Sequence, residues 1–251
     1  MNYTYPTHAY GDTRCMNLKL YTPDNGIVRR FVLALHGFAG DMESDAIELL
    51  AKHLTQQQTA VLSFNYAGHG NDTQDALFSL ECCLNDFLEA VRFAKQTFPY
   101  AQWRGIFATS FGGFLTLNSL QMIPADVRIV LRAPAVNMPQ VFARIVGREG
   151  GGMDKFAKEG SVVLGYEHRL EVPYTFYNEL LAHDVFMQDH DREMLLIHGD
   201  RDDVVLPEDT AAFCARNPKI IRKVITGADH LFHKPGELER VMDAAVPWLT
   251  D

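Results

Sequence analysis

Residues 106–113 have the sequence IFATSFGG, in which Ser110 lies between a β-branched and aromatic run and a pair of glycines. The residues before Ser110 have the composition of a buried strand, and the glycines after it open an apolar stretch with helical spacing. A serine on a sharp strand-to-helix turn, with small neighbours, is typical of a nucleophile elbow, which holds the hydroxyl clear of the backbone. This stretch therefore predicts an α/β fold with a nucleophilic serine at the end of a strand.

The elbow departs from its usual pattern at one position. The pattern is Gly-x-Ser-x-Gly, and Ala108 occupies the place of the first glycine. The turn crowds this residue and requires a small side chain, and a methyl group is the smallest departure from glycine. We therefore expect Ala108 to be tolerated.

Short apolar runs alternate with amphipathic stretches along the chain, which predicts a mostly parallel sheet flanked by helices. The expected strands are residues 31–35, 60–64, 105–108, 128–131, 194–197 and 220–225. The expected helices are residues 43–57, 80–98, 111–122, 207–215 and 237–249. Pro207 and Pro235 stand where helix starts are expected. The length suits one large domain, so we expect a single domain over residues 1–251.

Residues 134–186 interrupt this alternation. They contain three consecutive glycines, 150–152, and a segment, 161–172, that predicts a short hairpin turning at Glu167 and His168. Insertions of this kind leave the carboxyl edge of a parallel sheet and cover the site there. We therefore expect a small cap insertion at about residues 134–186.

Two groups of side chains in the expected cap have open roles. The aromatic residues either line an apolar pocket or pack the cap onto its domain; they are Tyr166, Tyr174, Phe176 and Tyr177. The basic residues either meet a carboxylate or, as we expect, form a solvated surface; they are Arg144, Arg148, Lys155 and Lys158.

The composition excludes several classes of function. The formal net charge of -9 disfavours nucleic acid and anionic membranes as partners and favours a small, neutral or weakly charged molecule. No apolar run approaches the roughly 18 residues of a membrane helix, and residues 1–6 lack the basic and apolar segments of a secretory signal. The four cysteines show no C-x-x-C spacing, so neither a zinc site nor a redox motif is predicted. We expect a cytoplasmic protein that needs no metal.

Two loops downstream of Ser110 supply an acid and a histidine. Residues 195–207, LLIHGDRDDVVLP, leave a strand and carry three carboxylates, and residues 225–232, ITGADHLF, leave a second strand and carry His230. A serine hydroxyl needs a base to take its proton, and the base needs an acid to orient it. Hydrolases with a nucleophile elbow carry these groups in the order serine, acid, histidine. The loops satisfy this order.

Four motifs together resemble a known family. They are residues 36–38 (HGF), residues 66–72 (YAGHGND), the elbow, and the acid and histidine loops. With these motifs the chain resembles serine hydrolases of the α/β-hydrolase superfamily, and most of all the compact feruloyl or cinnamoyl-type carboxylesterases with a short cap. The resemblance implies the α/β-hydrolase fold and covers residues 36–230.

The resemblance also selects the acid and the base. In that family the acid follows H-G-x-x and precedes x-V-V, which points to Asp202; we expect Asp200 and Asp203 to brace the loop through side-chain-to-backbone bonds. His230 matches the family's histidine. We expect the nearby His233 to be a surface residue.

Two backbone amides are expected to stabilise the oxyanion of the tetrahedral intermediate. One is the amide of Phe111, which follows the nucleophile, and the resemblance supplies the amide of Phe38 as the other. The remaining loop histidines are expected to be structural: His36 and His69 brace loops, and His198 is a buried, satisfied histidine.

The expected activity is hydrolysis of a carboxylic ester of a small or aromatic acyl group, through an acyl-enzyme and without a cofactor. Phe38 and Phe111 flank the serine and are expected to narrow the pocket. A thioesterase, a lactonase and a peptidase on the same triad remain alternatives, as does a non-catalytic ligand-binding protein with a hydrolase fold. A haloalkane or epoxide hydrolase needs an aspartate at the elbow, so Ser110 argues against that class.

Overall fold

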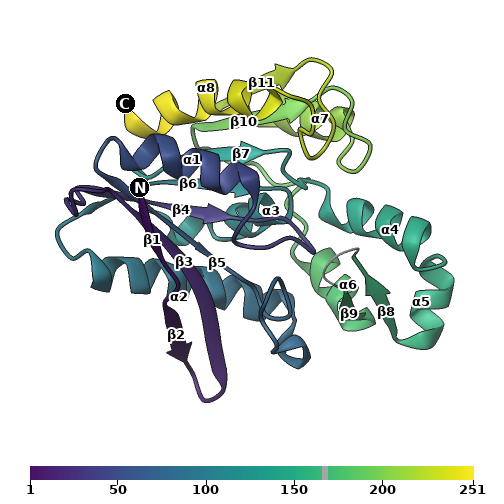
Figure 1. Ribbon diagram of the computed structural model, residues 1–251. Coiled ribbons are helices and arrows are strands. Elements are labelled where there is room, and N and C mark those ends of the chain that lie inside the picture. The colour runs from purple at the N-terminus through teal and green to yellow at the C-terminus, as the bar shows by residue number, and fades with distance from the viewer. Residues whose placement is uncertain (166–168) are drawn as a thin grey trace.

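A nine-stranded sheet forms the centre of the fold in the computed structural model, which describes residues 1–165 and 169–251 (Figure 1). Its strands are β1 (Asn2–Thr4), β2 (Thr7–Tyr10), β3 (Arg14–Thr22), β4 (Arg30–Leu35), β5 (Thr59–Phe64), β6 (Gln102–Thr109), β7 (Arg128–Arg132), β10 (Met194–Gly199) and β11 (Ile220–Ile225). Their order is β1-β3-β5-β4-β6-β7-β10-β11, with β2 paired to β3 outside this path. The strands from β5 to β11 in this order run parallel, so the predicted mostly parallel sheet is confirmed.

Helices cover both faces of the sheet, as predicted (Figure 1). They include α1 (Asp45–Thr55), α2 (Leu80–Thr97), α3 (Phe111–Asn118), α7 (Pro207–Arg216) and α8 (Glu237–Thr250). Helices α1 and α8 contact each other on one face, and α2 and α3 lie on the other. Successive residues of a strand point to opposite faces: Val32 packs in the core under α1 and α8, and Leu33 in the core under α2 and α3. Burial on both faces explains why the strands are almost continuously apolar.

Helix α3 is shorter than predicted, and Pro235 does not take the position expected of it at the start of α8. Helix α3 ends at Asn118, and a 3₁₀ turn, η2 (Leu120–Met122), replaces its expected last turn. The amide of Ser119 there bonds to the carbonyls of both Leu115 and Thr116, which tightens the turn. Pro207 begins α7 as expected, but Pro235 does not begin α8, because Gly236 adopts a left-handed φ of 82° before the helix starts.

The N-terminal strands were not predicted from the sequence. Strand β3 lies antiparallel to β5 and carries β1 and β2 on its other side. Its first half does alternate, with Met16 and Leu18 buried, Cys15 exposed and Asn17 partly exposed. This period of two is the signal of a strand. The alternation is short, because every residue from Leu18 to Tyr21 is buried.

The insertion at residues 134–186 is more regular than its sequence suggested. It contains α4 (Met138–Glu149), α5 (Met153–Glu159), β8 (Ser161–Leu164), β9 (Leu170–Pro173) and α6 (Tyr174–Ala182). Strands β8 and β9 pair antiparallel, so the hairpin is present where it was predicted. The expected turn residues, Glu167 and His168, lie outside the described residues.

Candidate active site

Ser110 occupies a sharp turn between β6 and α3. It has a φ of 49° and a ψ of -111°, a conformation that is rare for a residue other than glycine and that is typical of strained functional positions. Close packing surrounds this turn: a Cβ added at Gly112 would lie 2.7 Å from Leu35 Cβ, and one at Gly113 would lie 2.7 Å from Pro134 Cβ. Ala108 is fully buried in β6, and its methyl group is accommodated beside the turn.

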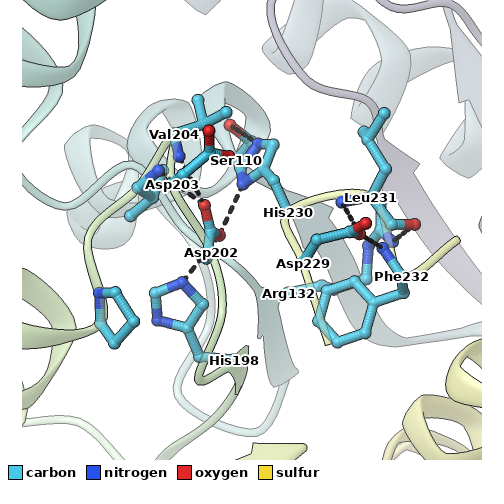
Figure 2. Close-up of polar contacts among 12 residues, drawn as sticks. Ser110, Arg132, His198, Asp202, Asp203, Val204, Asp229, His230, Leu231 and Phe232 are labelled. Carbon is cyan, nitrogen blue, oxygen red and sulfur yellow. Dashed lines mark hydrogen bonds and ion pairs between the residues drawn. The ribbon is translucent and has the colours of Figure 1, made fainter. Parts of the chain in front are cut away.

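The structure brings Ser110, Asp202 and His230 together (Figure 2). His230 Nε2 lies 3.1 Å from Ser110 Oγ, and His230 Nδ1 lies 2.7 Å from Asp202 Oδ2. Asp202 comes from the loop after β10 and His230 from the loop after β11. Since the carboxyl ends of parallel strands meet at one edge of the sheet, the three side chains converge there. They form one continuous chain of hydrogen bonds.

Asp202 is buried and fully hydrogen-bonded. Its Oδ1 accepts from the amides of Val204, at 2.9 Å, and Val205, at 2.8 Å, and its Oδ2 also contacts His198 Nε2 at 2.8 Å. Burial by itself raises the pKa of Asp202, but the hydrogen bonds from His198 and His230 outweigh burial and lower this pKa well below its usual range. The carboxylate is therefore ionised at neutral pH and can stabilise a protonated His230.

His198 has a closer connection to the site than its sequence indicated. It is fully buried, as expected, but its Nε2 contacts the acid itself, and its Nδ1 lies 2.6 Å from Thr210 Oγ1. Thr210 is held in turn by the carbonyl of Pro207, to which its hydroxyl is hydrogen-bonded at 3.1 Å. Asp202 is thus clamped between two histidines. The sequence signal for this contact was the spacing His198-x-x-x-Asp202, because His198 lies in β10 and Asp202 in the loop that follows it.

The two neighbouring aspartates behave differently from each other. Asp200 Oδ1 accepts from the amide of Gly227 at 2.6 Å, the predicted side-chain-to-backbone bond, and so ties the acid loop to the histidine loop. For Asp203 the prediction was wrong. Its side chain is exposed and pairs with Arg148 at 3.4 Å, because Asp202 already takes the loop amides.

The basic residues of α4 are at least partly exposed, and both also pair with carboxylates of the chain. Arg144 Nη2 donates to the carbonyl of Val204 at 3.3 Å and pairs with Asp209 at 3.4 Å. Arg148 Nη2 donates to the carbonyl of Asp203 at 2.8 Å. Helix α4 is therefore attached to the loop that carries Asp202. Lys155 and Lys158, on α5, are exposed as expected.

The loop after β4 lies against the elbow. A Cβ added at Gly37 would lie 3.3 Å from Ser110 Cβ, so the backbone that leads to Phe38 passes directly beside the serine. Within the described part of the chain, the amides of Phe38 and Phe111 take part in no turn or loop hydrogen bond.

The other histidines lie where the sequence suggested. His36 Nδ1 contacts the carbonyl of Gly37 at 2.8 Å, and His69 Nδ1 contacts the carbonyl of Ala67 at 3.0 Å. Both rings brace loops. His233 is exposed and pairs with Asp229 at 3.1 Å.

A cavity of about 380 Å³ opens beside Ser110 and His230. Phe38, Ile145 and Leu231 contribute apolar walls to it. Phe111 was expected to narrow this cavity. Its side chain does not do so, because its ring is fully buried below the elbow.

The described cap aromatics, Tyr174, Phe176 and Tyr177, are not among the residues that line this cavity. Phe176 is fully buried, with its ring centroid 4.7 Å from that of Phe78 and 6.2 Å from that of Phe38. Inside the insertion, the ring of Tyr174 meets that of Phe156 edge-on, and the ring of Tyr177 stacks on that of Phe142 with 6.1 Å between centroids. Tyr166 lies outside the described residues. Packing of the cap onto its domain is therefore correct for Phe176, whereas Tyr174 and Tyr177 pack within the cap.

Arg132, at the end of β7, is a residue of the site that the sequence reasoning missed. It lines the cavity, and its backbone carbonyl accepts from the amide of Ser110 at 3.0 Å. Its guanidinium lies over the ring of Phe232, 5.1 Å from the ring centroid (Figure 2). Burial lowers the pKa of Arg132 to about 10, which keeps its charge at neutral pH. Its position at a strand end of the catalytic edge was the signal that could have found it.

Among residues 1–165 and 169–251, no group of three or more histidine, cysteine, aspartate or glutamate side chains is arranged to hold a metal ion. No helix within the same residues has the length and apolar character needed to cross a bilayer.

The fold and the elbow define an α/β hydrolase. The chain belongs to the family described as serine aminopeptidase, S33, whose model matches residues 26–190. Among curated proteins, no sequence gives a significant match.

Solved structures similar to this chain include several hydrolases. Est1E from Butyrivibrio proteoclasticus, solved with ferulic acid bound, is 23% identical with a TM-score of 0.74, and the alignment covers 92% of each chain. The esterase domain of a Rhodothermus marinus protein is 21% identical with a TM-score of 0.75, covering 99% of this chain and 98% of that one. Mouse alpha/beta hydrolase domain-containing protein 10 is 18% identical with a TM-score of 0.73, covering 97% of both. At these identities the likeness shows the shared fold.

Proposed function

We propose that this hydrolase cleaves carboxylic esters of small or aromatic acyl groups, with Ser110 as nucleophile, His230 as base and Asp202 as acid. The observation that carries the proposal is the unbroken hydrogen-bond chain from Asp202 through His230 to Ser110, at 2.7 and 3.1 Å. Such a chain is the geometry by which a serine hydroxyl becomes a nucleophile.

In the proposed reaction, His230 Nε2 takes the proton from Ser110 Oγ as Oγ attacks the ester carbonyl carbon. The amides of Phe38 and Phe111 donate hydrogen bonds to the resulting oxyanion. The carbon–oxygen bond to the alcohol breaks, and the alcohol leaves with the proton from His230. Water then gives a proton to the same histidine and attacks the acyl-enzyme, which releases the acid and restores Ser110.

The size and lining of the cavity support a small or aromatic acyl group. Its volume of about 380 Å³ is near the lower end of the roughly 300–1,000 Å³ that is usual for ligand pockets. Phe38, Ile145 and Leu231 offer apolar contact to a short or flat group. Of the similar structures, one is described as Est1E with ferulic acid bound and another as an esterase domain.

We further propose that residues 134–186 act as the cap of this single domain. The insertion contributes Ile145, Glu149 and Gly165 to the cavity wall. Its helix α4 is attached by arginines to the acid loop, so the cap and the triad are mechanically connected.

The test compares wild type with Ser110→Ala on p-nitrophenyl acetate, butyrate and octanoate and on methyl ferulate. We expect turnover of the short or aromatic esters, its loss in the variant, and labelling of wild type but not the variant by a fluorophosphonate probe. Folded wild-type protein that neither hydrolyses nor labels would contradict the proposal and favour a binding protein.

A peptidase is the second candidate, because the matched family is described as a serine aminopeptidase. Aminoacyl p-nitroanilides belong in the same substrate panel, together with a thioester and a lactone. Faster turnover of the anilides than of the esters would replace the ester proposal with this one.

A further inference from the structure

Arg132 is a buried cation beside the proposed nucleophile. Its side chain is 5% exposed, yet it contributes to the wall of the cavity that Ser110 and His230 also line. Its Nε donates to Thr109 Oγ1 at 3.2 Å, and Thr109 directly precedes the serine. The guanidinium is therefore next to the place where the ester carbonyl reacts.

No carboxylate of the described residues lies within ion-pairing distance, 4.0 Å, of the Arg132 guanidinium. Its hydrogen bonds go to neutral acceptors, the hydroxyl of Thr109 and, at 3.4 Å, the carbonyl of Leu231, and within the same residues Nη2 has no partner. Buried charges in proteins are normally paired, because desolvation without a partner is costly.

The chain's other deeply buried arginine shows the usual solution. Arg14 is also 5% exposed, and it is ion-paired to both Asp72 and Asp86. Arg132 has the same burial without such partners. The contrast indicates that the counter-ion of Arg132 is not supplied by the described part of the chain.

The carboxylates Asp202 and Asp229 favour the charged form of Arg132 through their own charges, but both are already engaged by other partners. Asp202 is bonded to two histidines and two amides, and Asp229 accepts from the amides of Leu231 and Phe232 and pairs with His233. Asp41 and Glu149 also line the cavity, but Asp41 is partly exposed and Glu149 is exposed. Water screens exposed charges more strongly than buried ones, so these two do not neutralise Arg132.

We propose that the cavity takes an ester that carries a free carboxylate on its acyl or alcohol part, and that Arg132 binds this carboxylate. This inference rests on the proposed ester hydrolysis and names its substrate class. The planar guanidinium matches a carboxylate in geometry as well as in charge. A single cation suits one carboxylate.

A positioning role is the competing explanation. Arg132 holds the carbonyl of Leu231 and the ring of Phe232, both close in sequence to His230. A residue that only positions the histidine affects neutral and anionic esters alike. A residue that binds the substrate carboxylate affects their ratio.

The test therefore measures ratios of kcat/KM between matched esters in wild type, Arg132→Met and Arg132→Lys. The acyl arm compares mono-p-nitrophenyl succinate with p-nitrophenyl butyrate, and the alcohol arm compares 4-acetoxybenzoate with phenyl acetate. In the arm whose carboxylate Arg132 binds, we expect Arg132→Met to lower the anionic-to-neutral ratio of kcat/KM about 10- to 100-fold. This is the contribution of a hydrogen bond between charged groups. Arg132→Lys should recover part of the ratio.

An unchanged ratio in both arms would overturn the inference and leave the ester proposal standing, provided that Ser110→Ala abolishes turnover. Thermal unfolding of each variant checks that it is folded. Binding of succinate and benzoate by calorimetry is a second readout that needs no turnover. If wild type hydrolyses no ester, the proposed function fails, and binding that is lost in Arg132→Met still supports the carboxylate site, whereas no binding to wild type overturns it.

Discussion

Ser110 is held in a strained backbone conformation by the residues packed around it. A positive φ costs a residue with a side chain roughly 1–3 kcal/mol, so the surroundings must impose it. Gly112 makes this possible, because Leu35 and His36, at the end of β4, pass too close for any side chain there. The conformation of the elbow thus depends on the glycines as much as on the serine.

Gly112→Ala should therefore destabilise the protein by about 1–3 kcal/mol, the usual cost of overpacking, and lower esterase activity. The added Cβ would lie 2.7 Å from Leu35 Cβ and 2.8 Å from the carbonyl oxygen of His36. Urea unfolding and kcat/KM on p-nitrophenyl acetate measure the two effects. Gly147→Ala is the matched control: it lies in α4 with nothing within 4 Å of the added Cβ, and we expect it to stabilise by up to about 1 kcal/mol. Equal stability of the two variants would contradict this account.

His198 acts through Asp202, since its Nε2 contacts the carboxylate that orients His230. His198→Phe should lower kcat about 10- to 100-fold, the contribution of a hydrogen bond to a charged group, with little change in KM. His198→Gln keeps an amide donor and should recover part of kcat. A kcat equal to that of wild type in the Phe variant, or a Gln variant as slow as the Phe variant at equal stability, would argue against a positioning role.

Helix α4 was not predicted, although its sequence has a clear helical pattern. Its buried residues include Met138, Val141, Phe142 and Val146, which recur at the spacing of one helix face. The glycines that follow, 150–152, suggested irregular structure and hid this signal. The pattern does not show what the opposite face of the helix contacts, which is the acid loop after β10.

The arginines of α4 are expected to restrain that loop without adding much global stability. Their ion pairs are partly exposed, and such pairs contribute at most about 1 kcal/mol. In the double variant Arg144→Ala and Arg148→Ala, we expect faster hydrogen exchange at the amides of Val204 and Val205, with the free energy of unfolding lowered by less than about 1 kcal/mol. Lys155→Ala, which removes an exposed pair on α5, is the control. Unchanged exchange in the double variant would show that the loop is rigid without α4.

At the scale of the whole molecule, a buried polar network holds the N-terminal strands to helix α2. Arg14 of β3 bonds to Asp86 of α2 through Nε at 2.9 Å and Nη2 at 3.0 Å, and Tyr10 of β2 donates to the same carboxylate at 2.9 Å. Burial raises the pKa of Asp86 in spite of the bonds from Arg14. The network links strands β2 and β3 to helix α2.

Asp86→Asn should lower the free energy of unfolding by about 3–5 kcal/mol, because it leaves a buried guanidinium without one of its partners. Arg92→Ala, on the same helix, removes an exposed partner of Glu89 and should cost less than about 1 kcal/mol. Urea unfolding measures both variants. A loss for Asp86→Asn as small as that for Arg92→Ala would show that the N-terminal strands do not depend on this network.

Local patterns in the sequence determined the elements and the chemistry of this protein. Continuous apolar runs predicted the parallel strands, the turn around Ser110 predicted the elbow, and the loops after two later strands supplied Asp202 and His230. These features are readable because each depends on residues that are near one another in the chain.

The tertiary structure decided which of these groups meet and what surrounds them. The contact of His198 with Asp202, the attachment of α4 to the acid loop, and the unpaired burial of Arg132 beside Ser110 were not predicted. Arg132 lies at the site because β7 is paired between β6 and β10. Strand order arises from packing between distant segments, and burial removes water from a charge only after those segments have come together, so neither is written in a local pattern.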